Sequence, residues 1–598
     1  MITPMTKYSF ILLNGQQDAL LEKLQEVGLV DITRSAKPMD DHSRELASEI
    51  ELVSGLIRGL NTIEILEGTQ PITYSGEGSE DPVRLTGGLL MALSDVENNV
   101  QTLQKREKAL TVWGSFDKDV LDQLAAAGVP LHFHQVSAKA FRESWSEEYP
   151  LSVIAREDGN VYFVVAADNN LPGEVSAPSG GDYHSVHAEL LDEQKKLRHM
   201  QGIILAIKQN MSVLEQRLAD AYAHLDLYLA GAAAVPAAED TIVTLVGYAP
   251  VEDETAVTAA LDATGAFYLK EAAVVDDNPP IKLHNNWFVK QFEVLTDMYG
   301  RPAYDGFDPT PFISVFFLLF FAFCMGDAGY GLILIGIGLL LKKADGFKDM
   351  APLVVLLGIG TTIIGFLFHT FFSIDISTWS IFEPVKGIFL PAKIAGYDGT
   401  MVLALIVGVV HLCLAMCVKT YQETKNKGFI NALGSWGWTL LIVGGIIVAA
   451  LAFGGVMDKD LTKWVVIVLG VVSALGIFVF NDMKRNKLAN VGVGLWNTYN
   501  TATGLLGDVL SYLRLYALGL AGSMLGMAFN NIGTMVLGDG SSALLWIPFV
   551  LIVLIGHTLN IAMAALGAFV HPLRLNFLEF FKNSGYEAAG RNFNPLKK

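Results

Sequence analysis

Two arginines stand within long apolar stretches near the end of this 598-residue chain. Arg514 lies in residues 500–537, where Asp508 is the only other charged residue, and Arg574 lies in the next stretch, residues 542–581. A guanidinium stays charged at any biological pH, and placing it at the centre of a membrane costs a few kcal/mol or more. Two such charges in consecutive segments are hard to explain by packing and indicate ion translocation.

The helix face around each arginine is small and polar. Steps of three and four residues keep to one face, where small residues let another helix come close and aligned polar groups can hold water. Two alternatives remain open: an ordinary tightly packed bundle, or buried ion pairs in which Asp508 or Glu579 neutralises an arginine. The faces contain Asn500, Gly504, Gly507 and Ser511 before Arg514, and His557, Asn560, Ala564, Gly567 and His571 before Arg574.

Other polar residues in the apolar stretches could line aqueous half-channels, cap broken helices or lie at the membrane interface. They include His369, His411, Asn530 and Asn531. Asp327 ranks above them because it falls at a predicted helix break. The residues predicted to serve ion translocation are Arg514, Arg574, Asp327, Ser511, His571, Glu579, Asp508 and Asn500.

Charge divides the chain into two unlike halves. Residues 1–299 hold 22 Lys and Arg against 45 Asp and Glu, a net charge of −23, whereas residues 300–598 hold 20 against 16, a net charge of +4. So acidic a first half argues against a nucleic-acid or anionic-lipid surface there. We predict a cytoplasmic domain over residues 1–300 and a transmembrane domain over residues 301–598.

Seven apolar runs follow Pro311, each long enough to cross about 30 Å of hydrocarbon as a helix. Basic residues concentrate in the loops 342–350, 419–430 and 481–490, which the positive-inside rule places in the cytoplasm. The runs are residues 311–341, 351–372, 400–419, 434–454, 462–480, 500–537 and 542–581.

The first run is predicted to be two short helices. As one span it would put the first basic loop and the acidic domain on opposite sides, and residues 325–331 contain three glycines and Asp327. We therefore predict an α-helical membrane protein of about eight transmembrane helices, with both termini cytoplasmic. The last two runs, of 38 and 40 residues, would extend roughly 57–60 Å as helices. They must be tilted or bent, with Pro548 and Pro572 as candidate kinks.

Long amphipathic segments dominate the first half. Apolar residues recur every seven positions from Leu190 to Leu225, and residues 46–60 and 89–110 follow a similar pattern. This spacing predicts an α+β domain built on a long antiparallel coiled coil, with helices over about 40–115 and 183–230. Strand-like patches, which predict small α/β lobes, occur at residues 7–12, 151–154, 161–165 and 241–246.

Signatures of independent catalysis are absent from the sequence. It has no GxxxxGK[ST] phosphate loop, no HExxH and no nucleophile elbow, so the chain by itself is expected to hydrolyse nothing. Its three cysteines all lie in apolar segments, which excludes a disulfide scaffold, and no metal-ligand spacing occurs. We also expect no signal peptide, because residues 1–14 lack a basic region followed by an apolar core.

Three motifs resemble those of one family. Residues 511–521, SYLRLYALGLA, resemble the SYLRLxALxLA signature of the large membrane subunit, called a or I, of vacuolar/archaeal-type rotary ATPases. Residues 571–580, HPLRLNFLEF, are similar to HxLRLxxxEF, and MYGRPAY and MGDAGYG at residues 298–304 and 325–331 are a third marker. With the coiled-coil half, the resemblance covers nearly the whole chain, and the short loops fit a prokaryotic member.

The resemblance implies a non-catalytic stator subunit beside a ring of proteolipid (c/K) subunits in the plasma membrane. Arg514 would meet each ring carboxylate, lower its affinity for H⁺ or Na⁺ and block leakage between two half-channels, with Arg574 assisting. The cytoplasmic rod would dock on peripheral-stalk (E/G-type) subunits. A central-stalk (d/C-type) subunit and membrane lipid are further expected partners, and no cofactor, metal or nucleic acid is expected.

The sequence departs from the family's pattern at Asn500, Gly522 and Ala564, where members have a carboxylate, a histidine and a glutamate, so those half-channel groups do not carry over. The main alternative is a secondary transporter with a regulatory coiled-coil domain, and a second is a signalling protein with a membrane sensor. A transporter would bind its substrate within one chain, whereas a stator subunit beside a proteolipid ring requires a carboxylate on another chain.

Overall fold

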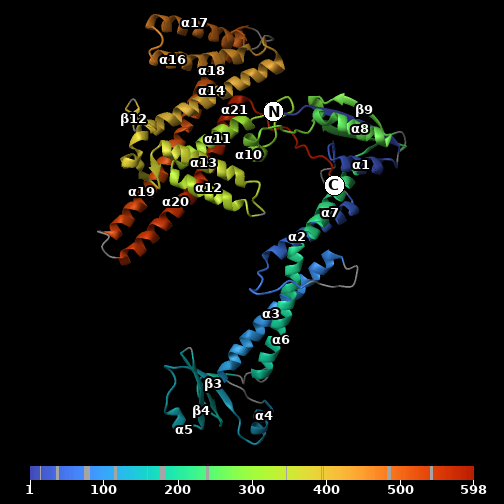
Figure 1. Ribbon diagram of the computed structural model, residues 1–598, viewed down its shortest axis with the longest axis vertical. Coiled ribbons are helices and arrows are strands. Elements are labelled where there is room, and N and C mark those ends of the chain that lie inside the picture. Colours follow the sequence, from blue (N-terminus) through green and yellow to red (C-terminus); the bar gives the residue numbers. More distant parts are fainter. Residues whose placement is uncertain are drawn as a thin grey trace. The chain divides into compact units, whose positions relative to one another are not determined.

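The computed structural model describes residues 1–597 except 14, 35–39, 73–80, 114–117, 158, 176–182, 238–240, 345, 392, 395, 481–486 and 539–542. Lys484 and Arg485 of the third basic loop lie outside the described residues. Tertiary contacts divide the chain into two units (Figure 1). The first comprises residues 1–11, 29–32 and 246–595, and the second comprises residues 12–28, 33–245 and 596–598.

Paired helices build the second unit. α3 (Pro82–Trp113) packs along α6 (Tyr183–Gln209), and α2 (Asp41–Thr62) packs against α7 (Ser212–Ala232) (Figure 1). His187 near the start of α6 contacts Glu107 near the end of α3, so this pair is antiparallel. The residues that recur every seven positions enter one apolar core with those of α2 and α3, among them Val53, Val100, Leu190, Leu197 and Ile204. Supercoiling of these helices into a coiled coil stays a prediction.

The apolar seam continues from α6 into α7 although the helix does not. Residues 210 and 211 interrupt it, and Val213 N bonds to Asn210 O at 3.1 Å and Leu214 N to Met211 O at 3.0 Å. These are i→i+3 contacts, which tighten a helical turn. Leu214, beyond the interruption, still lies in the shared core.

The N-terminus of α2 is tied to α7 by one carboxylate. Asp40 caps α2 by accepting a hydrogen bond from Ser43 N at 2.8 Å, and it also accepts the Tyr228 hydroxyl. Hydrogen bonds from the Ser43 side chain and then from Tyr228 lower the pKa of Asp40 to about 2. The pKa of an aspartate in an unfolded chain is about 3.9. The stability that this ionised cap contributes is therefore fully present above about pH 4, and it is lost as the pH falls through about 2.

We expect Asp40→Asn to remove this pH dependence while keeping a capping side chain. The variant's thermal midpoint should lie a few degrees below that of the wild type at pH 7, and the two should converge as the pH approaches 2. Thermal melts of the purified chain followed by circular dichroism measure this. A constant gap at every pH would contradict a role for the charge.

Two larger antiparallel sheets accompany the helices. The second unit contains a sheet of order β4-β5-β3-β6, formed by β3 (His132–Ser137), β4 (Leu151–Glu157), β5 (Asn160–Val165) and β6 (Glu174–Val175). The other has the path β2-β8-β1-β9, formed by β1 (Met5–Leu13), β2 (Asp31–Ile32), β8 (Ile242–Pro250) and β9 (Phe267–Ala272). α1 (Gln17–Val27) follows β1, and α8 (Glu254–Thr264) follows β8. The strands predicted from sequence are confirmed, whereas β2, β3, β6 and β9 were not predicted.

Eight apolar helical segments lie beyond residue 309 in the described part of the first unit. Three are short, α11 (Thr310–Met325), α12 (Ala328–Leu341) and α13 (Ala351–Leu367), and reach only about 21–26 Å at 1.5 Å per residue. Five are long and apolar enough to cross a membrane. They are α14 (Gly399–Lys427), α15 (Leu433–Thr439) with α16 (Gly445–Phe453), α17 (Lys459–Phe478), α18 (Lys487–Ser511) with α19 (Leu513–Leu537), and α20 (Trp546–Arg574) with α21 (Phe581–Ser584).

The predicted break in the first apolar run is confirmed. α11 ends at Met325, Gly326 adopts a left-handed conformation with φ 54°, and Asp327 caps the start of α12. α13 then returns along α12, and the two helices lie very close together. A Cβ atom added at Gly331 of α12 would lie only 2.5 Å from Thr362 N of α13. The glycines of this motif therefore serve both the turn and the helix contact.

Candidate ion-translocation site

Arg514 lies near the start of α19, directly after an irregular turn. Tyr512 separates α18 from α19, and Tyr512 N bonds to Val509 O at 3.2 Å and Leu515 N to Tyr512 O at 3.1 Å, both i→i+3 contacts. The Tyr512 ring is fully buried in a notch at Gly408 of α14, where an added Cβ would lie 2.3 Å from the ring. Its hydroxyl is 2.9 Å from His411 Nδ1. The long run predicted over residues 500–537 is thus divided between two helices.

Neither arginine forms an ion pair within the part of the chain that the structure describes. Asp508 lies 3.3 Å from Lys582 Nζ and accepts a hydrogen bond from Asn583 at 2.9 Å. Glu579 is buried, and its Oε2 has no hydrogen-bond partner among the described residues. Arg514 Nη1 is buried and also has no acceptor there. A buried charged donor without an acceptor is costly, which favours an acceptor outside this chain over the internal ion pairs.

Arg574 and Glu579 lie on either side of a change in helix geometry. Arg574 is the last residue of α20 and is exposed. A π-helical turn, Leu575–Phe580, follows it and brings Glu579 into the interior. Single π-helical turns occur frequently at functional sites. The partly buried His571 lies one turn before this change, next to Pro572 inside α20.

Asn500 and Asp508 both line a polar cavity of about 400 Å³. Its walls come from α18, from the second half of α14, from α15 and from residues 582–583. We call it the basic-side cavity because it lies near the ends of α14 and α21, next to the second basic loop. Ser511 lies close by, and its hydroxyl donates to the backbone oxygen of Asp508 at 2.6 Å. The residues that line it include Lys419, Thr420, Asn497, Asn500, Asp508 and Lys582.

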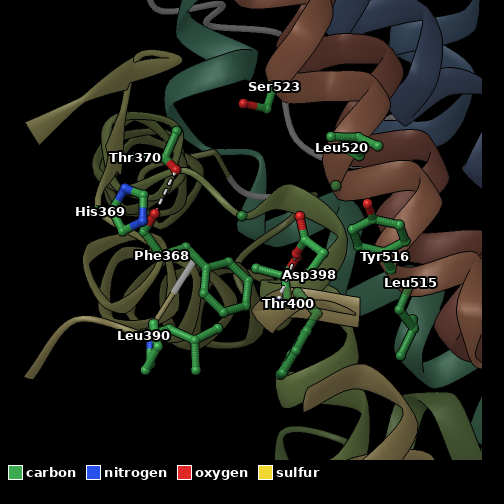
Figure 2. A pocket seen from close by; sticks show the side chains of 14 residues that line it. Phe368, His369, Thr370, Leu390, Asp398, Thr400, Leu515, Tyr516, Leu520 and Ser523 are labelled. Atoms are coloured by element: carbon green, nitrogen blue, oxygen red, sulfur yellow. Dashed lines mark hydrogen bonds between the residues drawn. The ribbon is translucent and has the colours of Figure 1, made fainter. Parts of the chain in front are cut away.

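A second cavity, of about 250 Å³, lies at the start of α14 (Figure 2). We call it the outer cavity because its walls include the segment between α13 and α14, opposite the basic loops. Figure 2 shows His369 and Thr370 across from Tyr516 and Leu520 of α19. Of these residues, the sequence marked His369 as a polar candidate and Leu515, Tyr516, Gly519 and Leu520 only as part of a motif. The loop residues Thr370, Asp398 and Thr400 were not marked. The lining includes His369, Asp398, Thr400, Leu515, Tyr516 and Ser523.

The two cavities end on either side of Arg514. Along α14 they are separated by the 16 positions from Thr400 to Met416, which is about 24 Å of helix. Along α18 and α19 the gap is only seven positions, from Asp508 to Leu515, or about 10 Å. Tyr512 and Arg514 occupy this gap. A buried aromatic ring and a fixed positive charge therefore separate the two cavities.

Asp327 follows Gly326, which lines the outer cavity, but Asp327 itself is in the lining of neither cavity. Its carboxylate is 3% exposed and accepts backbone hydrogen bonds of 2.6–3.2 Å from Gly329, Tyr330, Phe372 and Ser373. Phe372 and Ser373 have φ values of 47° and 57°, which residues other than glycine adopt only rarely. The carboxylate thus fixes both the helix break and the segment after α13. This geometry supports the helix-capping alternative over a place in an aqueous path.

A buried hydrogen-bond network that the sequence did not predict joins α12, α19 and α20. The Tyr330 hydroxyl is 2.7 Å from His557 Nδ1 and accepts a hydrogen bond from Asn560 Nδ2 at 2.8 Å. His557 Nε2 is 3.0 Å from Asn530 Oδ1, and Asn560 also donates to Gly522 O at 2.8 Å. The spacing of His557 and Asn560 on one helix face was the available signal, but nothing local pointed to Tyr330.

Comparison with known proteins places the arginine segments in a matched region. The profile of the V-type ATPase 116kDa subunit family matches residues 189–384 and 502–598, which include every predicted site residue except Asn500. The A-type ATP synthase subunit I of Methanocaldococcus jannaschii is 32% identical over 54% of this chain and 49% of its own length, so the chain spans about half the length of that relative. The V-type ATP synthase subunit I of Borreliella burgdorferi is 22% identical over 100% of both chains.

Among solved structures, the cytoplasmic N-terminal domain of a subunit I, described as a homolog of subunit a of V-ATPase, is 13% identical to this chain. The match covers 44% of this chain and 100% of that one. Its TM-score is 0.19, which is too low to establish a shared fold.

Proposed function

Because the chain belongs to the V-type ATPase 116kDa subunit family, we propose that it is the stator membrane subunit of a V/A-type rotary ATPase or ATP synthase. In this role it forms two ion half-channels against a proteolipid (c/K) ring and couples H⁺ or Na⁺ movement to rotation, without catalysing ATP chemistry itself. The observation that carries the proposal is the position of Arg514, which has a buried N–H without an acceptor among the described residues and lies between the ends of the two cavities.

The path begins at one cavity and ends at the other. An ion that enters through one cavity binds a ring carboxylate, travels with the rotating ring and leaves through the second cavity. When the ring carboxylate reaches Arg514, the guanidinium stabilises its ionised form and lowers its ion affinity. Because Arg514 keeps its charge, it also repels a cation that would pass directly between the cavities.

The remaining segments hold this site in place. The eight apolar segments cross the plasma membrane with the basic loops and both termini in the cytoplasm, and residues 301–598 form the ion-translocating domain. Residues 1–300 remain in the cytoplasm, where their helices dock on peripheral-stalk (E/G-type) subunits and a central-stalk (d/C-type) subunit. Arg574, His571 and Glu579 lie beside the π-turn and assist Arg514 on the next helix.

Purification in mild detergent distinguishes this proposal from a self-sufficient secondary transporter. The chain should be isolated together with proteolipid and ATP-hydrolysing subunits, and vesicles containing the assembly should show ATP-driven ion transport. A preparation of this chain alone that catalyses transport in reconstituted vesicles would contradict the proposal, since a ring carboxylate would then be unnecessary.

Asp508→Asn is expected to slow ATP-driven transport several-fold without preventing assembly. The substitution leaves Lys582 unpaired beside the basic-side cavity and makes that cavity more positive, which disfavours entry of a cation. Initial transport rates of inverted membrane vesicles measure the effect. The exposed Asp349→Asn removes a carboxylate from the first basic loop and serves as the control. Equal rates for the two variants would show that Asp508 has no part in the path.

A further inference from the structure

The outer cavity has a titratable pair at the wall that lies across from Tyr516 and Leu520 of α19 (Figure 2). His369 lines the cavity, and its Nδ1 lies 3.1 Å from Asp375 Oδ1. The side chain of Asp375 is 52% exposed and that of His369 is 29% exposed. His369 therefore stands between a solvent-exposed carboxylate and the cavity, which is the position of a relay between the two.

The His369 ring is held in place by its backbone. His369 has a φ of 50°, in the region that favours glycine, and Ile376 N bonds to its carbonyl oxygen at 2.9 Å. The same segment is fixed three and four residues later by Asp327, which accepts hydrogen bonds from Phe372 N and Ser373 N. The Phe389 ring packs 6.0 Å from the imidazole. Such a backbone persists only when its surroundings enforce it, and strain of this kind clusters at functional sites.

The chemistry of the cavity leaves His369 as its natural proton carrier. Its titratable lining groups are His369, Asp398 and Tyr516, and a tyrosine ordinarily ionises near pH 10. Asp398 caps α14 and accepts a hydrogen bond from Thr400 N at 3.0 Å. His369 Nδ1 has no aligned hydrogen-bond partner among the described residues, despite its closeness to Asp375. An imidazole can take a proton on one nitrogen and release one from the other.

We propose that His369 and Asp375 form a proton-transfer pair at the mouth of the outer cavity. A proton from the outer solution binds the pair, forms imidazolium at His369 and leaves to water in the cavity, from which the ring carboxylate takes it. The reverse sequence operates when protons exit. The charged groups near the His369 imidazole are Asp375, on the same segment as His369, and Asp398, across the cavity. This inference rests on the proposed function and adds that the ion in this path is a proton.

The test is ATP-driven and reverse transport in vesicles containing the whole complex, measured over a range of pH on the outer face. We expect His369→Gln to slow proton transfer, and the ATP hydrolysis coupled to it, by about tenfold or more, while the complex still assembles. Imidazole added on the outer face should restore much of the rate, because this diffusible base replaces the missing histidine side chain. His284→Gln, an exposed histidine of the same unit, is the matched control and should behave like the wild type.

Asp375→Asn keeps the histidine and changes its partner. It should move the pH profile of transport toward lower pH, because imidazolium loses a neighbouring negative charge. A wild-type pH profile in both variants would overturn the relay. So would a slow His369→Gln complex that imidazole does not restore, because a purely structural defect gives that result. If the wild-type complex itself fails to transport ions, the proposed function fails first, and that result is distinct from either of these.

Discussion

Arg514→Ala is expected to abolish ATP-driven ion transport while the complex still assembles. The side chain is only partly buried and no ion pair ties it to the described residues of its own chain, so its removal leaves no unpaired internal acid. Under the proposed function, what is lost is the charge that releases the ion from the ring carboxylate between the two cavities. Transport by inverted vesicles should fall to the background measured with an uncoupler present, whereas the ring should still be isolated with the chain.

Arg514→Lys tests whether charge alone is sufficient. A lysine keeps a positive charge but lacks the planar fork that contacts both oxygens of a carboxylate, so we expect this variant to fail as well. Lys343→Ala, which removes an exposed charge from the first basic loop, is the control for altered net charge. Normal pumping by the Arg514→Ala complex would refute the role assigned to this residue.

The second large effect is expected from Asp327→Ala, and it concerns assembly. Four backbone N–H groups would lose their acceptor at once, and each buried donor left unsatisfied costs about 1–3 kcal/mol. The segment with positive φ after α13 would lose what holds it. We expect the variant to be nearly absent from membranes, measured as the amount of chain per milligram of membrane protein.

Asp327→Asn separates capping from ion conduction. The amide retains one acceptor oxygen, so this variant should accumulate to an intermediate level, and its transport per assembled complex should approach that of the wild type. Normal accumulation combined with lost transport would instead place Asp327 in the ion path, as its intramembrane charge first suggested.

Local sequence signals were sufficient for the elements but not for the cavities. The helix break at Gly326 and Asp327 was predictable because glycines and a capping carboxylate act within a few residues. The interruption at Tyr512 was not, because that tyrosine sits in an otherwise regular apolar pattern. It depends on a notch at Gly408, more than one hundred residues earlier in the chain.

In the candidate site, too, local sequence predicted some features, whereas others depend on contacts between distant segments. Asn500 and Asp508 both lie on α18 and were each predicted to serve ion translocation, and they line the same cavity. Lys582 joins them only through tertiary packing, as does the partnership of His369 with Asp375 and the α19 residues of the outer cavity. A period of 3.6 residues identifies a polar stripe on one helix, but it carries no information about which distant segment completes it.

The most direct measurement is a density map of the intact complex in which the ring and this chain are both resolved. It should show the Arg514 guanidinium within about 3–4 Å of a ring carboxylate, or joined to it by one water, with the two cavities opening on either side. A guanidinium turned away from the ring and bound to Glu579 or Asp508 of its own chain would contradict the account.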